Sequence, residues 1–115
     1  MEQHYKLDKI RDLAGGDTEF IETIAMTFLE EVPEDAKTLK ISVDSHDYLA
    51  TYKAAHKMKP TVDLFELGVL DTLIEVQDWG KFEQKENDRN VSAKLDIVLA
   101  AIDRAVEEIK IDFNL

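Results

Sequence analysis

One histidine of this chain stands beside lysines in a segment whose apolar residues follow a helical period. His56 lies three residues before Lys59, and Lys53 and Lys57 are close by in the sequence. A neutral imidazole nitrogen is a good nucleophile at cellular pH, and an ammonium group beside it would stabilise a phosphoryl group carried on the ring. Because residues three apart lie on the same side of a helix, we expect His56 and Lys59 to lie side by side. From these residues alone an ordinary solvated histidine is the default interpretation, and a phosphoryl group carried on the imidazole is the specific chemical alternative.

Other kinds of site lack the residues that they need. The chain has neither G-x-x-x-x-G-K nor G-x-G-x-x-G, which disfavours a kinase or ATPase acting alone. No Glu or Asp stands three residues before any of the three histidines, so the Glu-x-x-His pairs of di-iron bundles are missing. No serine lies in a strand-to-helix turn of the kind that presents a hydrolase nucleophile. The absence of cysteine removes disulfides and thiolate metal sites.

Composition places the chain among small acidic domains. Its 115 residues fit one domain over residues 1–115, and 14 basic against 25 acidic side chains give a formal charge of −11. Such a surface disfavours nucleic acids and anionic membranes, which bind proteins chiefly through Lys and Arg. The sequence has no run of about 18 apolar residues and no apolar N-terminal run. We therefore expect a soluble protein of the cytoplasm.

The spacing of the apolar residues predicts helices, because these residues recur at steps of three and four. A short helix should precede Gly15 and Gly16, since glycines are a natural helix stop. Four longer apolar faces follow, within residues 21–43, 48–62, 65–76 and 95–109. The phase of the first continues across Pro33, which predicts one bent helix there. The sequence predicts an all-α fold, an antiparallel up-down four-helix bundle with a short N-terminal capping helix.

Capping residues and charge predict where the helices begin and end. Asp17 is suited to cap the helix that follows it, and Asn90 or Ser92 to cap the last helix. The mostly charged run 81–89 is expected to form an exposed loop before that last helix, with room for frayed helix at either end.

The segment around His56 resembles the motif of a known family. Residues 54–61, AAHKMKPT, are similar to the A-H-x-L-K-G-[S/A] motif of histidine-containing phosphotransfer (HPt) domains. Residues 5–17, YKLDKIRDLAGGD, and 28–33, FLEEVP, resemble the family's N-terminal helices in order and spacing, as do Phe20 and Ile21 between them. The resemblance covers about the first two thirds of the chain, and the last helix matches only in length and pattern. It implies a four-helix bundle with one exposed histidine.

The resemblance also implies a role for each matching residue. His56 would accept the phosphoryl group, and Lys59, three residues on, would bind the phosphoryl oxygens. Met58 takes the place of the family's leucine, which is an exchange of similar volume. Gln77 or Asp78 lies where some members place a polar residue against the imidazole.

The implied mechanism makes the chain a carrier and not an enzyme. A receiver-domain aspartyl phosphate would supply the group, and a second receiver would accept it. The implied partners are response-regulator receiver domains and a hybrid sensor histidine kinase. The receiver would hold the Mg²⁺, so we expect no cofactor and no metal site in this chain, and a monomer as in the family.

The partner should dock on an apolar patch with a polar rim around His56. On a straight-helix projection, the apolar candidates fall within about 40° of the direction of His56. With the neighbouring lysines, the expected docking residues are Leu49, Lys53, Lys57, Pro60 and Leu67.

Two residues depart from the family pattern. Pro60 replaces the glycine after the lysine, and Glu66 replaces a glycine expected at the start of the next helix. Because proline has no N–H, the carbonyl of His56 loses its helical donor, and a kink is expected just below the nucleophile. Glu66 adds a negative side chain nearby and weakens the match.

Two other interpretations stay open. A helical adaptor would bind a signalling protein without chemistry, and replacing His56 would leave its binding nearly unchanged. A small metal-binding bundle could use His46, His56 and carboxylates, but the sequence lacks metal-ligand spacing. An initiating Met1 and a last helix ending close to Leu115 favour a free-standing protein over an excised domain.

Overall fold

A computed structural model describes residues 4–115, so the expectation based on Met1 lies outside the described residues. Every regular element in this range is a helix, and the prediction of an all-helical chain is confirmed. The elements are α1 (Asp8–Ala14), α2 (Thr18–Asp44), α3 (Tyr48–Leu64), α4 (Leu70–Lys81), the 3-10 turn η1 (Lys85–Asn87) and α5 (Asp88–Asp112).

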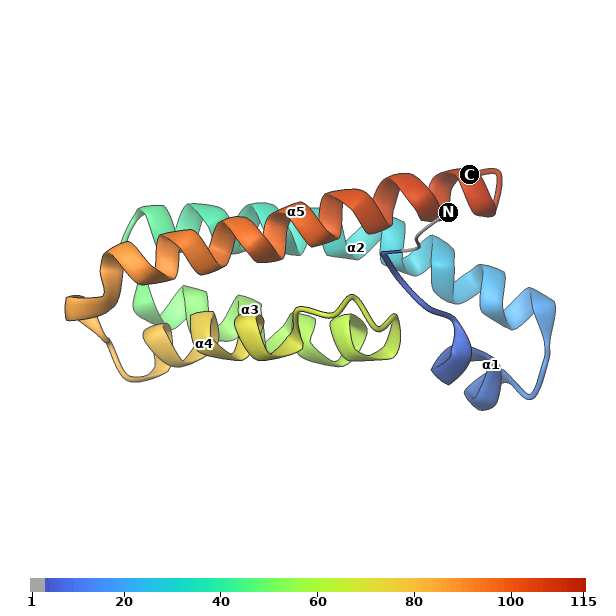
Figure 1. Cartoon of the computed structure of the whole chain (residues 1–115), viewed down its shortest axis with the longest axis horizontal. Helices are drawn as coiled ribbons and strands as arrows, with labels where there is room; N and C mark the ends of the chain where they lie inside the picture. The colour runs from blue at the N-terminus through green and yellow to red at the C-terminus, as the bar shows by residue number, and fades with distance from the viewer. Residues whose placement is uncertain (1–3) are drawn as a thin grey trace.

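The four long helices lie side by side along the long axis of the molecule, which measures 46 × 24 × 20 Å (Figure 1). Helix α3 packs on α2 and α4, and α5 packs on the same two helices from the other side. The end of α4 lies against the beginning of α3, because Gly80 meets the backbone of Tyr48 and Tyr52. These two helices are therefore antiparallel. Helix α1 lies at one end of the molecule and contacts α2.

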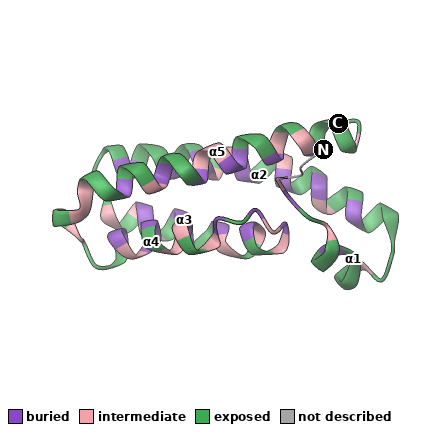
Figure 2. Cartoon of the chain, in the orientation of Figure 1, coloured by how far each residue is buried: buried purple, intermediate pink, exposed green. Residues whose placement is uncertain are grey.

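The buried side chains form one core between the helices. Figure 2 marks the buried residues in purple along the four long helices, and these residues form a single cluster. Apart from the half-buried Ile24 and Tyr48, the residues at the helical-period positions of the four longer predicted faces are buried, whereas Leu13 of the short first helix is exposed. The largest fully buried side chains are Trp79, Tyr5, Phe28 and Phe65, with Ile10, Leu39 and Met58 next.

The predicted helix ends are mostly correct. Asp17 accepts a hydrogen bond from the backbone N–H of Phe20 at 3.3 Å, as an N-cap should. Gly15, with φ 62°, ends α1 in the left-handed conformation that glycine adopts at little cost. Helix α2 runs unbroken through Pro33, which confirms one helix rather than two.

The predicted start of the last helix is wrong. Helix α5 begins at Asp88, before Asn90 and Ser92, and η1 occupies part of the expected loop. The Asp88 carboxylate accepts a hydrogen bond from the indole of Trp79 at 3.0 Å and pairs with His46 Nε2 at 3.1 Å. These contacts anchor the first residue of α5 to α4 and to the turn between α2 and α3, so the helix starts there.

His4 and Tyr5 of the N-terminal segment form hydrogen bonds with two carboxylates of α5. The Tyr5 hydroxyl, on a buried ring, donates to Asp112 at 2.6 Å. The backbone N–H of His4 donates to Glu108 at 2.7 Å, and the His4 ring contacts the same carboxylate. Burial, and then the bond to Asp112, raises the pKa of Tyr5 well above its ordinary value. We call this group of four residues the terminal clasp.

Replacing Tyr5 with phenylalanine should change how stability depends on pH. When folding raises the pKa of a group, the group makes its full contribution to stability below its unfolded pKa, which is about 10 for tyrosine. That contribution is lost as the pH rises from the unfolded pKa toward the folded pKa. We expect Tyr5→Phe to cost about 1 kcal/mol at pH 8 through the lost hydrogen bond. At pH 11 the difference between wild type and variant should shift by about 1.4 kcal/mol in favour of the variant. Urea unfolding at both pH values measures this, and an unchanged difference would contradict it.

Candidate functional site

The outer face of α3 carries the candidate nucleophile. His56, Lys53 and Pro60 are exposed, and Leu49 is 62% exposed, whereas Met58 is buried in the core. Helical spacing of three and four places the exposed residues in one stripe. The fold therefore presents the imidazole to solvent, with a lysine and a leucine on the same side of the helix.

The His56 imidazole has one ring neighbour. The ring of Tyr52, one turn earlier in α3, stacks on it with centroids 5.6 Å apart and planes 25° apart. Within residues 4–115 the imidazole forms no side-chain hydrogen bond and no ion pair. The ring nitrogens are thus left for an incoming group.

The three neighbouring lysines are not equivalent. Lys57 donates to Asp35 of α2 at 2.9 Å, and this hydrogen bond raises the pKa of Lys57. Its ammonium is thereby held at the α2 side of α3. Lys53 is exposed and Lys59 half-buried, and neither forms an ion pair in the part of the chain that the structure describes. Lys53 and Lys59 are therefore the two of these three lysines that have no ion pair in the described residues.

The expectation that Leu67 is exposed on the docking surface is wrong. Leu67 is only 7% exposed, because α3 ends at Leu64 and residues 65–69 turn back toward the core. The backbone N–H of Lys6 donates to the carbonyl of Phe65 at 2.8 Å and fixes this connection. A projection along a straight helix fails once the chain has left the helix.

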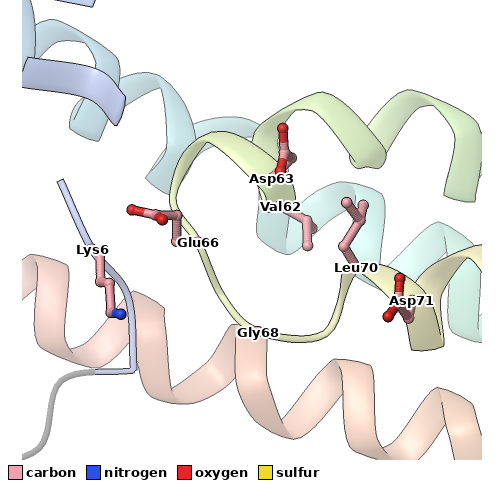
Figure 3. A pocket seen from close by; sticks show the side chains of 7 residues that line it. All are labelled: Lys6, Val62, Asp63, Glu66, Gly68, Leu70 and Asp71. Atoms are coloured by element: carbon pink, nitrogen blue, oxygen red, sulfur yellow. The ribbon is translucent and has the colours of Figure 1, made fainter. Parts of the chain in front are cut away.

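The connection after α3 borders a pocket of about 370 Å³ (Figure 3). Three carboxylates and one ammonium line it, together with Val62, Gly68 and Leu70. Figure 3 shows the Asp63, Glu66 and Asp71 side chains pointing in different directions, so they do not converge on a common ligand. In the described residues no three His, Asp or Glu side chains are grouped to hold a metal ion.

The two candidate partners of the imidazole lie on α4. Gln77 is 6% exposed, and its amide donates to Asp78 at 3.4 Å. The Gln77 Oε1 atom is buried with no hydrogen-bond partner among residues 4–115. Neither side chain is hydrogen-bonded to His56 in this structure. Their role beside the imidazole stays a prediction.

Pro60 lies inside α3, which continues to Leu64. The carbonyl of His56 therefore has no donor at residue 60, as the sequence indicates. Helix α4 begins only at Leu70, so Phe65, expected on the next helical face, belongs to the connection. Its side chain is buried all the same, against Phe28 at a centroid distance of 4.5 Å.

Glu66 occupies a backbone position that suits glycine. Its φ is 51°, in the left-handed region that costs a residue with a Cβ atom roughly 1–2 kcal/mol. Its Oε2 atom is also buried without a partner in the described part of the chain. Both features give a physical reason for a glycine at this point of the motif.

Glu66→Gly should therefore stabilise the protein. We expect the free energy of unfolding to rise by about 1 kcal/mol, since relief of the left-handed backbone and the buried oxygen exceeds the entropy cost of glycine. Urea unfolding measures the change. Glu83→Gly is the matched control, because Glu83 has φ 48° but is exposed, and so reports the backbone effect alone. A loss of stability in Glu66→Gly would show that the carboxylate has a partner.

Two features of the site did not follow from the motif. The motif does not include Tyr52, although a residue four positions before His56 lies within reach of it on a helix. The close approach of α4 at Gly80 was also missed, because it depends on how two helices pack. The sequence carries no distinct signal for it, because a glycine near the predicted end of a helix is an ordinary helix stop.

Within residues 4–115 no helix combines the length and the apolar character needed to cross a membrane. No protein-family model, no curated protein and no solved structure matches the chain.

Proposed function

We propose that this chain is a histidine phosphotransfer protein. It accepts a phosphoryl group on His56 from the aspartate of a receiver domain and passes it to another receiver. The observation that carries the proposal is the exposed imidazole of His56, free of side-chain hydrogen bonds within residues 4–115 and one turn of helix before Lys59. An exposed, unbonded nucleophile beside a cation is what a phosphoryl carrier needs.

The arrangement of the helices supports this proposal. We interpret α2 to α5 as an antiparallel up-down four-helix bundle and α1 as its cap, which is the fold that the resemblance to HPt domains implies. Each long helix contacts two others, as in a four-membered bundle. The outer face of one helix in such a bundle can approach a partner without changing the core.

The proposed step needs little from the carrier beyond position and charge. A nitrogen of the neutral His56 ring attacks phosphorus in line, and the N–P bond forms as the P–O bond to the receiver aspartate breaks. The aspartate leaves as a carboxylate, and the proton on the other ring nitrogen passes to solvent. Lys59 neutralises the phosphoryl oxygens together with the Mg²⁺ of the receiver. The chain itself then contributes no cofactor and is not an enzyme acting alone.

The docking surface follows the exposed stripe of α3. Its apolar part is Leu49, which is 62% exposed on this stripe. Lys53 and Pro60 extend the surface around His56. A basic rim on a protein of net charge −11 is suited to the acidic active site of a receiver domain. We propose receiver domains and a hybrid sensor histidine kinase as partners, a monomer as the working state and the cytoplasm as its location.

Intact mass after incubation with a phosphorylated receiver domain and Mg²⁺ tests the proposal. We expect the gain of one phosphoryl group, labile in acid and stable in alkali as a phosphohistidine is, and located at His56 by fragmentation. If the mass does not change with several different receivers while one of them still binds, the chain is a helical adaptor and the proposal is overturned.

A further inference from the structure

The aromatic residue beside the candidate nucleophile lies where α3 is packed against α4. Tyr52 is half-buried at the point where α4 comes closest to α3. A Cβ atom at Gly80 would lie 2.9 Å from the backbone nitrogen of Tyr52, so the two backbones are nearly in contact. The Tyr52 side chain lines the groove between the two helices with Tyr48 and Leu49. The backbone of Tyr52 is therefore fixed against α4 and its side chain is half-buried, whereas His56 is exposed.

The contact between the two rings has the geometry of an offset stack. The centroid separation of 5.6 Å and the interplanar angle of 25° fall within the range of favourable aromatic pairs. Because no side-chain hydrogen bond in residues 4–115 orients the imidazole, this stack is the contact that limits rotation of the ring about its Cβ–Cγ bond. The Tyr52 ring thus lies on one side of the imidazole, and the imidazole nitrogens have no side-chain hydrogen-bond partner within residues 4–115.

We propose that Tyr52 is a positioning residue for phosphoryl transfer, holding the His56 imidazole with its nitrogens directed outward through the ring stack. The inference rests on the proposed function of His56. A nucleophile held near its attacking orientation avoids the loss of rotational freedom at the moment of reaction. The ring also becomes positively charged as its lone pair forms the N–P bond, until the proton on the other nitrogen leaves. The face of a tyrosine attracts such a cation.

Two variants separate the aromatic face from the hydroxyl group. Tyr52→Phe keeps the face, and Tyr52→Leu removes it while filling much of the same space. At saturating phosphorylated receiver, we expect Tyr52→Leu to transfer about fivefold more slowly than wild type and Tyr52→Phe to stay within about twofold. The receiver concentration at half-saturation should be unchanged in both. If that concentration rises while the saturating rate is unchanged, Tyr52 is a docking residue and the proposal is overturned.

Proton NMR of the unphosphorylated protein tests the stack without any partner. In wild type and Tyr52→Phe, the ring protons of His56 should show an upfield ring-current shift and nuclear Overhauser contacts to the ring of residue 52. Both should be absent in Tyr52→Leu, while the ring protons of His46 keep their positions and thermal unfolding shows that the variant is folded. Wild-type shifts for His56 in a folded Tyr52→Leu would overturn the positioning role.

The outcomes also separate the proposed function of His56 from the positioning role of Tyr52. If wild type shows the stack but takes no phosphoryl group, the proposed function fails and the positioning role fails with it. If wild type takes the group and Tyr52→Leu transfers it equally fast, only the positioning role fails.

Discussion

Gly80→Ala is expected to lower the free energy of unfolding by about 3 kcal/mol, more than a third of the stability of many small domains. The added methyl group would lie 2.5 Å from the carbonyl oxygen of Tyr48 and 2.9 Å from the nitrogen of Tyr52. Both are backbone atoms, so no side-chain rotation can relieve the contact. Helices α3 and α4 would have to move apart along an interface that includes the buried Trp79.

The sign of this effect distinguishes packing from helix propensity. In an open helix, glycine to alanine is stabilising by about 1 kcal/mol. Ala93 is exposed within α5, so Ala93→Gly is the matched control and should cost about 1 kcal/mol by propensity alone. Thermal and urea unfolding of both variants measures the two effects. A Gly80→Ala protein as stable as wild type would show that the helices are further apart than the structure has them.

His56→Gln is expected to abolish phosphoryl uptake and to leave stability within about 0.5 kcal/mol of wild type. A glutamine amide nitrogen is not a nucleophile, since its lone pair is delocalised into the carbonyl. The histidine ring is exposed and has no side-chain hydrogen bond within the described residues, so its removal exposes no core and leaves no buried group unpaired. Intact mass after incubation with a phosphorylated receiver, beside thermal unfolding, measures both parts.

A second histidine provides the control for this variant. His46 lies on the turn between α2 and α3, where its φ is 56°, and its ring pairs with Asp88. We expect His46→Gln to take up the phosphoryl group as wild type does and to lose no more than about 0.5 kcal/mol of stability, because the pair with Asp88 is solvent-exposed. Phosphoryl uptake that survives in His56→Gln but not in His46→Gln would move the carrier site to the other histidine.

Helical periodicity alone predicted which faces of the long helices are buried. The spacing of Leu95, Val98 and Ile102 fixed which face of α5 is buried, because one turn repeats every 3.6 residues. The same arithmetic along α3 placed His56 and Leu49 on the outside. Local periodicity is a reliable guide wherever the helix continues.

The errors come from contacts between different elements, which the periodicity of a single helix does not describe. Leu67 is buried because the chain turns inward after α3, which no projection along the helix contains. Helix α5 begins at Asp88 because Trp79 and His46 bind its carboxylate. The ion pair of Lys57 with Asp35 depends likewise on how α3 packs on α2. Such pairings depend on how the helices pack, and the local patterns of a single sequence do not reveal them.

The terminal clasp has a consequence for the order in which the molecule folds and opens. Tyr5 and Asp112 are 107 positions apart, so closing their contact encloses nearly the whole chain. The loop between α3 and α4 is short by comparison, and the entropy lost in closing a loop rises with its length. We therefore expect the hairpin of α3 and α4 to form early and the clasp last, and the clasp to open first under native conditions. His56 then lies on the part of the protein that stays closed while the two ends separate and rejoin.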